Sequence, residues 1–311
     1  MNLLALNPMR LFSALPGNIA QGIIWGIMAI GVYMTFRLLR FSDLSVDGSF
    51  ATVGAVAVML IINGIPAPIA MLVAFGAGIL AGLATGILHT VFGIPDILAG
   101  ILTQIALYSI NLRIMGGKAN QAVSVDKYSL AVSLRDIPSS LMVGGILAVL
   151  LIAVLYWFFG TEKGSAIRAT GCNPAMSMAQ GININSTKVL TLALSNGLVA
   201  FAGALLAQYQ GFADVNMGRG AIVIGLAAVI IGEVLGEALV GKRLSFFGRL
   251  LFVVIGGIVY YIVVGVVLWM KMPSNDLKLF TAIIVAVFLA VPYLRAKSQN
   301  SYAKAAKKGA K

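Results

Sequence analysis

Residues 41–50 read FSDLSVDGSF, and the interpretation of the whole chain depends on this polar stretch. An uncharged run at 11–36 precedes it, and a run of 48 residues without Asp, Glu, Lys or Arg begins within it, at Gly48. Asp43 and Asp47 therefore lie between segments that otherwise have the composition of membrane-spanning helices. Ionisable side chains are costly inside a bilayer, so two carboxylates at this place need a structural or functional reason.

The rest of the sequence has the composition of an all-α polytopic membrane protein. Hydrophobic residues make up 60% of the 311 positions and charged residues 10%, whereas a soluble domain carries about 25% charged residues. A spanning helix needs about 20 apolar residues, so the uncharged runs predict about nine transmembrane helices, within a range of about eight to ten. The runs are 11–36, 48–95 (two spans, broken at 64–68), 97–112, 137–161, 189–213, 220–232 (part of a broken helix), 250–270 and 279–294.

The distribution of basic residues predicts the orientation. Six of the 22 Lys and Arg residues lie at 295–311, and a basic tail after a final span is typical of a cytoplasmic C-terminus near anionic lipid. With nine spans the N-terminus then lies outside, and its first 16 residues lack the pattern of a cleaved signal peptide. We therefore expect a transmembrane domain at 1–294 and a basic cytoplasmic tail, and the net charge of +12 gives no reason to expect nucleic acid.

A second copy of the opening stretch predicts an inverted internal repeat. Residues 41–58, FSDLSVDGSFATVGAVAV, align with 212–229, FADVNMGRGAIVIGLAAV, and five of 18 positions are identical. Five predicted spans separate the copies, and an odd number of spans reverses the chain direction, as in inverted-topology transporters. The repeat halves would lie at about 17–160 and 188–294. A chance match between two apolar helices is the alternative.

Polar residues near the two helix starts are candidates for a translocation path. Asp43 or Ser45 can cap the following helix, and capping at the membrane surface is the alternative to lining a path. Helix breaks at membrane depth are tolerated only where they are buried in protein or line a cavity. Gln104 can instead bond a neighbouring helix, and Glu233 can pair with cations at 242–243. The candidates are Phe41, Asp43, Ser45, Asp47, Gln104, Phe212, Asp214, Asn216 and Glu233.

The predicted cytoplasmic loop at 161–187 carries the most specific local pattern. It contains GSAIRATGCNPAMSMAQGIN, residues 164–183. Asn173 followed by Pro174 is typical of a helix start, and Gly181 is typical of a helix stop. We expect a short helix at 174–180 whose apolar side chains contact another surface, and we expect Arg168 on a separate turn before it.

This loop resembles the cytoplasmic loop of permease subunits in ATP-binding-cassette importers of the branched-chain amino acid and ribose permease family. Gly164, Arg168, Ala169, Gly171, Asn173, Ala179, Gly181 and Ile182 fit the family pattern, whereas Met176, or Ser177, stands where the family more often has Ala. The stretch SDLSVDGSFATVGA is similar to a segment of ribose-type members, and the resemblance covers roughly residues 17–292. More narrowly, the overall sequence resembles a group of importers that have a single type of permease subunit. The lipoprotein partner in that group often binds aromatic amino acids.

The resemblance implies a type II-like importer fold and several partners. The helix at 173–181 would be a coupling helix that docks on a separate cytoplasmic ATPase, present in two copies. A second permease copy and an extracytoplasmic substrate-binding lipoprotein would complete the importer in the bacterial plasma membrane. ATP and magnesium would bind the ATPase, so the chain itself would hold no cofactor and would not be an enzyme. The implied coupling residues are Gly164, Arg168, Ala169, Gly171, Asn173, Pro174, Ala175, Met178, Ala179 and Gly181.

Other function classes fit the sequence less well. Residues 236–243, GEALVGKR, match part of a phosphate-binding loop but lack the following Ser or Thr and a preceding strand. An ion-coupled secondary transporter is the main alternative, because such proteins also use inverted repeats and broken helices. It would not need the coupling loop, and the sequence offers few mid-span carboxylates to carry ions. A passive channel would need no coupling helix, and a membrane enzyme would need a catalytic cluster.

Overall fold

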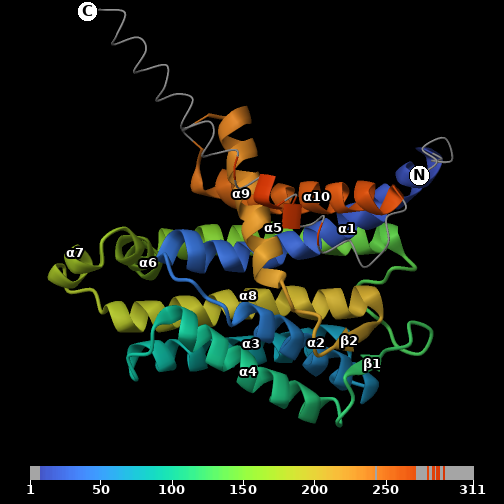
Figure 1. The fold of residues 1–311 in the computed structure, drawn as a ribbon, viewed down its shortest axis with the longest axis horizontal. Helices are drawn as coiled ribbons and strands as arrows, with labels where there is room; N and C mark the ends of the chain where they lie inside the picture. The colour runs from blue at the N-terminus through green and yellow to red at the C-terminus, as the bar shows by residue number, and fades with distance from the viewer. Residues whose placement is uncertain are drawn as a thin grey trace, which may run out of the picture.

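The computed structural model describes residues 8–241 and 244–270, together with residues 279, 282, 283, 285–287 and 290. The described residues form a helical bundle with one two-stranded sheet (Figure 1). The elements are α1 (Pro8–Tyr33), η2 (Met34–Leu39), α2 (Val46–Ile62), α3 (Ala67–Thr90), α4 (Asp96–Ile114), β1 (Asn120–Ala122), α5 (Ile137–Gly160), α6 (Glu162–Cys172), α7 (Pro174–Ala179), α8 (Ile184–Gln210), β2 (Phe212–Asp214), α9 (Ala221–Leu239) and α10 (Phe246–Trp269).

Seven helices of the described part are long and apolar enough to cross a membrane. They are α1 continued by η2, α3, α4, α5, α8, α9 and α10. The eighth apolar helix, α2, has only 17 residues, which is short for a hydrocarbon layer of about 30 Å. Helices thus form at the first seven uncharged runs, which hold eight of the nine predicted spans. The ninth predicted span, at 279–294, lies largely outside the described residues.

The most buried helices, α1 and α8, lie in the middle of the bundle. In their most apolar windows 83% of the α1 residues and 78% of the α8 residues are buried, against 22% for α5. Small residues let α3 approach α8 closely: a Cβ atom on Gly78 would lie 2.6 Å from the carbonyl oxygen of Asn196, and one on Gly86 would lie 3.0 Å from the Cα atom of Val189. Close approach of this kind is how helices associate in membranes.

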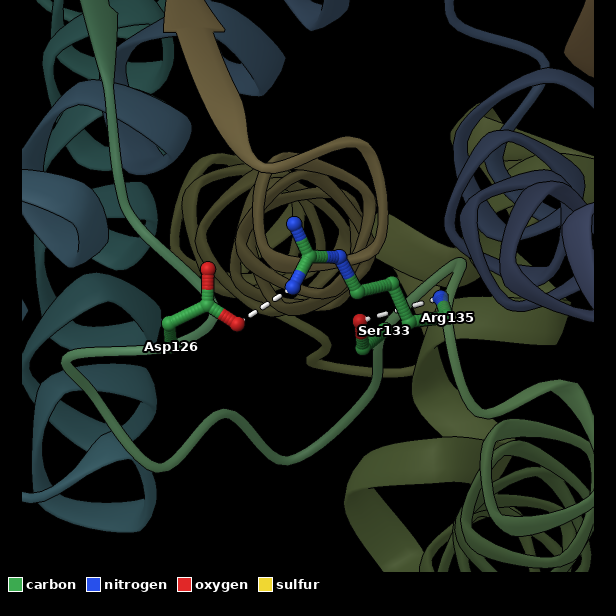
Figure 2. A network of polar contacts seen from close by, with 3 residues as sticks. All are labelled: Asp126, Ser133 and Arg135. Atoms are coloured by element: carbon green, nitrogen blue, oxygen red, sulfur yellow. Dashed lines mark hydrogen bonds and ion pairs between the residues drawn. The ribbon is translucent and has the colours of Figure 1, made fainter.

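The bundle has two different ends. At one end β1 pairs antiparallel with β2, with Asn120 opposite Asp214, and at the other end α6 and α7 extend beyond the bundle (Figure 1). Between β1 and α5, Arg135 donates from its guanidinium to the carboxylate of Asp126, and its backbone N–H donates to Ser133 Oγ at 3.2 Å (Figure 2). The segments at 112–137 and 211–219 therefore lie together at this end of the bundle.

The first long helix changes from α-helical to π-helical winding just before the polar stretch at 41–50. Its last six residues, Met34–Leu39, form the π-helical turn η2, and such turns occur frequently at functional sites. η2 ends at Arg40, whose φ of 56° makes it the one left-handed residue other than glycine among the described residues. This break lets the chain leave the helix and run through residues 41–45 to α2.

Candidate functional site

The two sequence copies meet where α2 and α9 begin. Asp47 in the first turn of α2 accepts hydrogen bonds from the backbone N–H groups of Gly220 and Ile222, each at 2.9 Å. These N–H groups open α9 and have no partner inside that helix. A carboxylate at this point also interacts favourably with the positive end of the helix dipole. Asp47 therefore caps the helix of the second copy.

Asp43 lies in a buried polar network. Its carboxylate accepts hydrogen bonds from the backbone N–H of Ser45 at 2.9 Å, from the Ser45 hydroxyl at 2.5 Å and from Asn196 Nδ2 at 2.8 Å. Ser49 Oγ donates to Asn196 Oδ1 at 2.6 Å. With Asp43 only 2% exposed, these bonds compensate for its removal from water. Ser45 occupies the N-cap position of α2, but its side chain accepts no capping hydrogen bond, so that predicted cap is wrong.

The turn at Asp214 repeats the turn at Asp43. The backbone N–H of Asn216 donates to Asp214 Oδ1 at 2.7 Å, as the N–H of Ser45 does to Asp43. Both residue pairs are related by the offset of the sequence alignment, since 214 − 43 and 216 − 45 each equal 171. The surroundings differ, because Asp214 ends β2 and accepts from Asn120 Nδ2 at 3.3 Å.

A cavity of about 340 Å³ lies beside Asp47, between the start of α2, the middle of α4 and the segment before α9. Three predicted path residues line it: Asp47, Gln104 and Asn216. The helices α2 and α4 come close here because a Cβ atom on Gly48 would lie 2.9 Å from Gln104 Cα. The cavity lining that sequence reasoning missed is Gly48, Ile105, Tyr108, Ser109, Asn111, Val215 and Arg219.

The other predicted path residues do not line this cavity. Phe41 packs edge-on against His89 with ring centroids 5.0 Å apart, and Phe212 lies in β2. Glu233 accepts a hydrogen bond from Arg37 Nε at 2.7 Å and so joins α9 to η2. The cations predicted to pair with Glu233, at 242–243, lie outside the described residues.

The short helix predicted at 174–180 forms. α7 spans Pro174–Ala179, Asn173 Oδ1 accepts a hydrogen bond from the backbone N–H of Met176 at 3.1 Å, and Gly181 has a φ of 80°. Met176 is 62% exposed and Met178 is 61% exposed, and Pro174, Ala175 and Ala179 are also exposed. α7 projects from the end of the bundle (Figure 1), so its apolar side chains face outward.

Arg168 precedes α7 as expected, and it lies on the regular helix α6, which is longer than a single turn. Its guanidinium donates to the carbonyl oxygen of Phe159 at 2.9 Å and lies 5.9 Å from the ring centroid of Phe246. Carbonyl groups in the last turn of a helix lack partners inside it, so Arg168 satisfies one at the end of α5. This contact fixes α6 to α5 and to the start of α10.

Two glycines of the predicted coupling set hold α6 close to the bundle. A Cβ atom on Gly171 would overlap the carbonyl oxygen of Leu38 in η2, and one on Gly164 would overlap the backbone of Phe159. Ala169 is exposed on the same helix. The predicted coupling residues therefore divide into an inner group that anchors α6 and an outer group on α7 whose methionine side chains are largely exposed.

Comparisons with known proteins identify relatives over most of the chain. The family described as branched-chain amino acid transport system / permease component matches residues 17–292. The tyrosine transport system permease protein of Clostridioides difficile is 39% identical over 91% of this chain and 93% of its own length. An uncharacterized protein of Rickettsia prowazekii is 29% identical over 87% of this chain and 94% of its own length.

A more distant relative is also an import permease. The autoinducer 2 import system permease protein LsrC of Yersinia pseudotuberculosis is 31% identical over 72% of this chain and 62% of its own length. No solved structure matches the chain. The resemblance inferred from the cytoplasmic loop is confirmed, and the apolar helices fit a multi-pass protein of the bacterial inner membrane. The chain belongs to the branched-chain amino acid transport system permease component family, the membrane-spanning permease subunits of ATP-binding-cassette importers.

Proposed function

We propose that this permease imports an aromatic amino acid, with L-tyrosine as the first candidate, delivered by an extracytoplasmic substrate-binding lipoprotein. The observation that carries the substrate class is the similarity to the tyrosine transport system permease, which covers nearly the full length of both chains. Similarity to the autoinducer 2 import permease is lower and covers less of each chain. An amino acid is therefore favoured over autoinducer 2 as the substrate.

The proposed architecture has nine spans in two inverted halves, at 17–160 and 188–294, joined by a cytoplasmic loop at 161–187. The N-terminus lies outside, and the tail at 295–311 lies in the cytoplasm. The matching turns at Asp43 and Asp214 support the repeat. So does a contact between equivalent positions, because a Cβ atom on Gly218 would overlap the carbonyl oxygen of Asp47, and 218 − 47 is again 171. Equivalent positions touch only near the axis that relates two copies.

In the proposed mechanism, movement of the ATPase enters the permease through α7. Two permease copies form a homodimer that binds two ATPase subunits, and ATP with magnesium binds on those subunits and not on this chain. The exposed methionines of α7 dock on the ATPase, while Arg168 and Gly171 transmit the displacement to α5 and η2. The ATPase shifts the population of inward- and outward-open states through its different contacts with α7 in each state.

The predicted path residues complete this proposal. The start of α2 around Asp43 and Asp47 borders the route of the substrate, together with Asn216 in the segment before α9 and Gln104 on α4. Phe212 and Asp214 lie toward its outer end, and the ion pair of Glu233 lies toward its inner end. Irregular backbone at this depth is acceptable because it is enclosed by protein or borders the cavity.

Reconstitution of the permease with its ATPase and binding protein in proteoliposomes tests the proposal. We expect ATP-dependent uptake of L-tyrosine, and we expect Arg168→Glu and Asn173→Ala to reduce uptake and the ATPase stimulation that the loaded binding protein causes. Loss of the Asn173 cap costs about 1 kcal/mol, so the spans of that variant stay folded. Lys118→Glu, on an exposed residue near β1 at the other end of the bundle, is the control.

Two results would contradict the proposal in different ways. Normal coupled transport by both coupling variants would remove α7 from the mechanism. ATP-dependent uptake of other amino acids, but not of tyrosine, would leave the proposed coupling mechanism intact. It would contradict the assignment of the substrate.

A further inference from the structure

The cavity beside Asp47 contains a buried amide with no partner. Asn111 is 1% exposed, lines the cavity, and has no hydrogen-bond partner at either Oδ1 or Nδ2 within the described part of the chain. An unpaired buried donor or acceptor costs about 1–3 kcal/mol, and the great majority of buried polar groups are paired. An unpaired donor and acceptor in one cavity wall indicate a ligand that supplies both an acceptor and a donor.

The same cavity has a guanidinium that forms no ion pair with any carboxylate among the described residues. Arg219 lines the cavity, and it takes part in neither of the two ion pairs among the described residues. The cavity's own carboxylate, on Asp47, is already bonded through both oxygens to the start of α9. A guanidinium matches a carboxylate with two parallel hydrogen bonds, so Arg219 is suited to an anionic group on the ligand.

One face of α4 supplies the remaining contacts. Gln104, Tyr108 and Asn111 are spaced four and three residues apart, which places them on one side of the helix, and all three line the cavity. Tyr108 is 42% exposed and presents an aromatic ring. The volume of about 340 Å³ is at the lower end of small-molecule pockets, which fits one small solute.

We infer that this cavity is a substrate-binding site inside the permease for a zwitterionic α-amino acid. Arg219 binds the carboxylate, and the amide of Asn111 donates to the carboxylate and accepts from the ammonium group. Gln104 also accepts from the ammonium group, and Tyr108 packs on the side chain of the amino acid. The inference rests on the proposed function and names its site. It makes the permease a second point of selection after the binding protein.

Asn111→Leu is the sharpest test, because it removes both unpaired polar atoms with little change in size. If Asn111 serves only the fold, replacing an unpaired amide by an apolar group is nearly neutral or stabilising and leaves binding unchanged. If Asn111 binds substrate, stability is retained while affinity falls. Arg219→Gln removes the charge, and Arg113→Gln, on the exposed last turn of the same helix and outside the cavity, is the matched control.

Binding is measured on the full-length permease with its ATPase subunits in nanodiscs, without binding protein and without ATP. The probes are L-tyrosine, tyramine, which lacks the carboxylate, and 3-(4-hydroxyphenyl)propionate, which lacks the ammonium group. We expect Asn111→Leu and Arg219→Gln each to weaken tyrosine binding at least 10-fold and to raise the KM of uptake, with Arg113→Gln unchanged. Arg219→Gln should not alter the weaker binding of tyramine.

The outcomes separate this inference from the proposed function. Wild-type uptake of tyrosine with unchanged affinity and KM in both cavity variants overturns the cavity site alone. Equal wild-type affinity for all three probes, or a density map with only water between Asn111 and Arg219 at saturating tyrosine, overturns it as well. Absence of amino acid uptake by the wild-type importer contradicts the proposed function first.

Discussion

Replacing Asp47 by asparagine tests whether one carboxylate holds the starts of α2 and α9 together. The two oxygens of Asp47 accept from Gly220 and Ile222 at 2.9 Å each. The amide of Asp47→Asn keeps one oxygen acceptor and places an NH₂ group where the second oxygen was. One backbone N–H of α9 then faces a donor, and the negative charge at the helix start is lost.

The size of the effect follows from these contacts. A hydrogen bond to a charged group contributes about 1.5–3 kcal/mol and a neutral one about 0.5–1.5 kcal/mol. The variant loses one charged bond, weakens the other to a neutral bond, and loses about 0.3–1 kcal/mol of interaction with the helix dipole. Because Asp47 borders the cavity, water recovers part of the loss, and we expect a destabilisation of about 2–4 kcal/mol.

Thermal unfolding of the purified permease in detergent measures this loss. At about 2–4 °C per kcal/mol for a large domain, the midpoint should fall by roughly 4–16 °C, and substrate uptake should fall with it. The control is Asp214→Asn, because within the described part of the chain that carboxylate bonds its own turn and Asn120. A midpoint for Asp47→Asn no lower than that of the control would refute the claim that Asp47 fastens α9.

Three further predictions concern contacts between distant parts of the chain. Arg37→Glu and Glu233→Arg should each slow uptake, and the double exchange should restore part of it. Since the Arg37 side chain is 54% exposed, the coupling energy in a double-mutant cycle should be about 0.2–1 kcal/mol. A coupling energy of zero would show that this ion pair does not contribute. Asn196→Leu removes a hydrogen bond from the buried carboxylate of Asp43 and should destabilise by roughly 1–3 kcal/mol in thermal unfolding, so an unchanged midpoint would contradict the network. Gly171→Leu should displace α6 from η2 and abolish binding-protein-stimulated ATP hydrolysis while the midpoint stays within about 2 °C of wild type; retained stimulation would exclude that contact from coupling.

Local chemistry allowed several elements to be predicted closely. The length of an apolar run is a direct property of the sequence, so α1, α3, α5, α8 and α10 formed where the uncharged runs placed them. The limits of α7 followed from Asn173, Pro174 and Gly181, because capping and a left-handed stop depend on neighbouring residues only.

Long-range pairing could not be predicted in the same way. Asp47 bonds Gly220 across 173 residues, and Arg37 bonds Glu233 across 196 residues; nothing in the spacing of one helix specifies which helix lies beside it. Asn196 was overlooked for the same reason, although an amide in the middle of an apolar run was an available signal. Arg168 was expected on a turn, but α6 is a regular helix of 11 residues whose glycines pack against α5 and η2.

The π-helical turn η2 sets the register of the segment that follows it. A π-turn holds one residue more than an α-turn, and each residue of an α-helix advances the chain by about 1.5 Å and rotates it by about 100°. Expelling that residue would therefore turn and lift everything that follows in one discrete step. The helix α6 packs against Leu38 in η2, and the segment from Arg40 to Asp47 follows η2 directly. A displacement of α6 would then reach the carboxylates of Asp43 and Asp47 as a change of register, without any long helix having to bend.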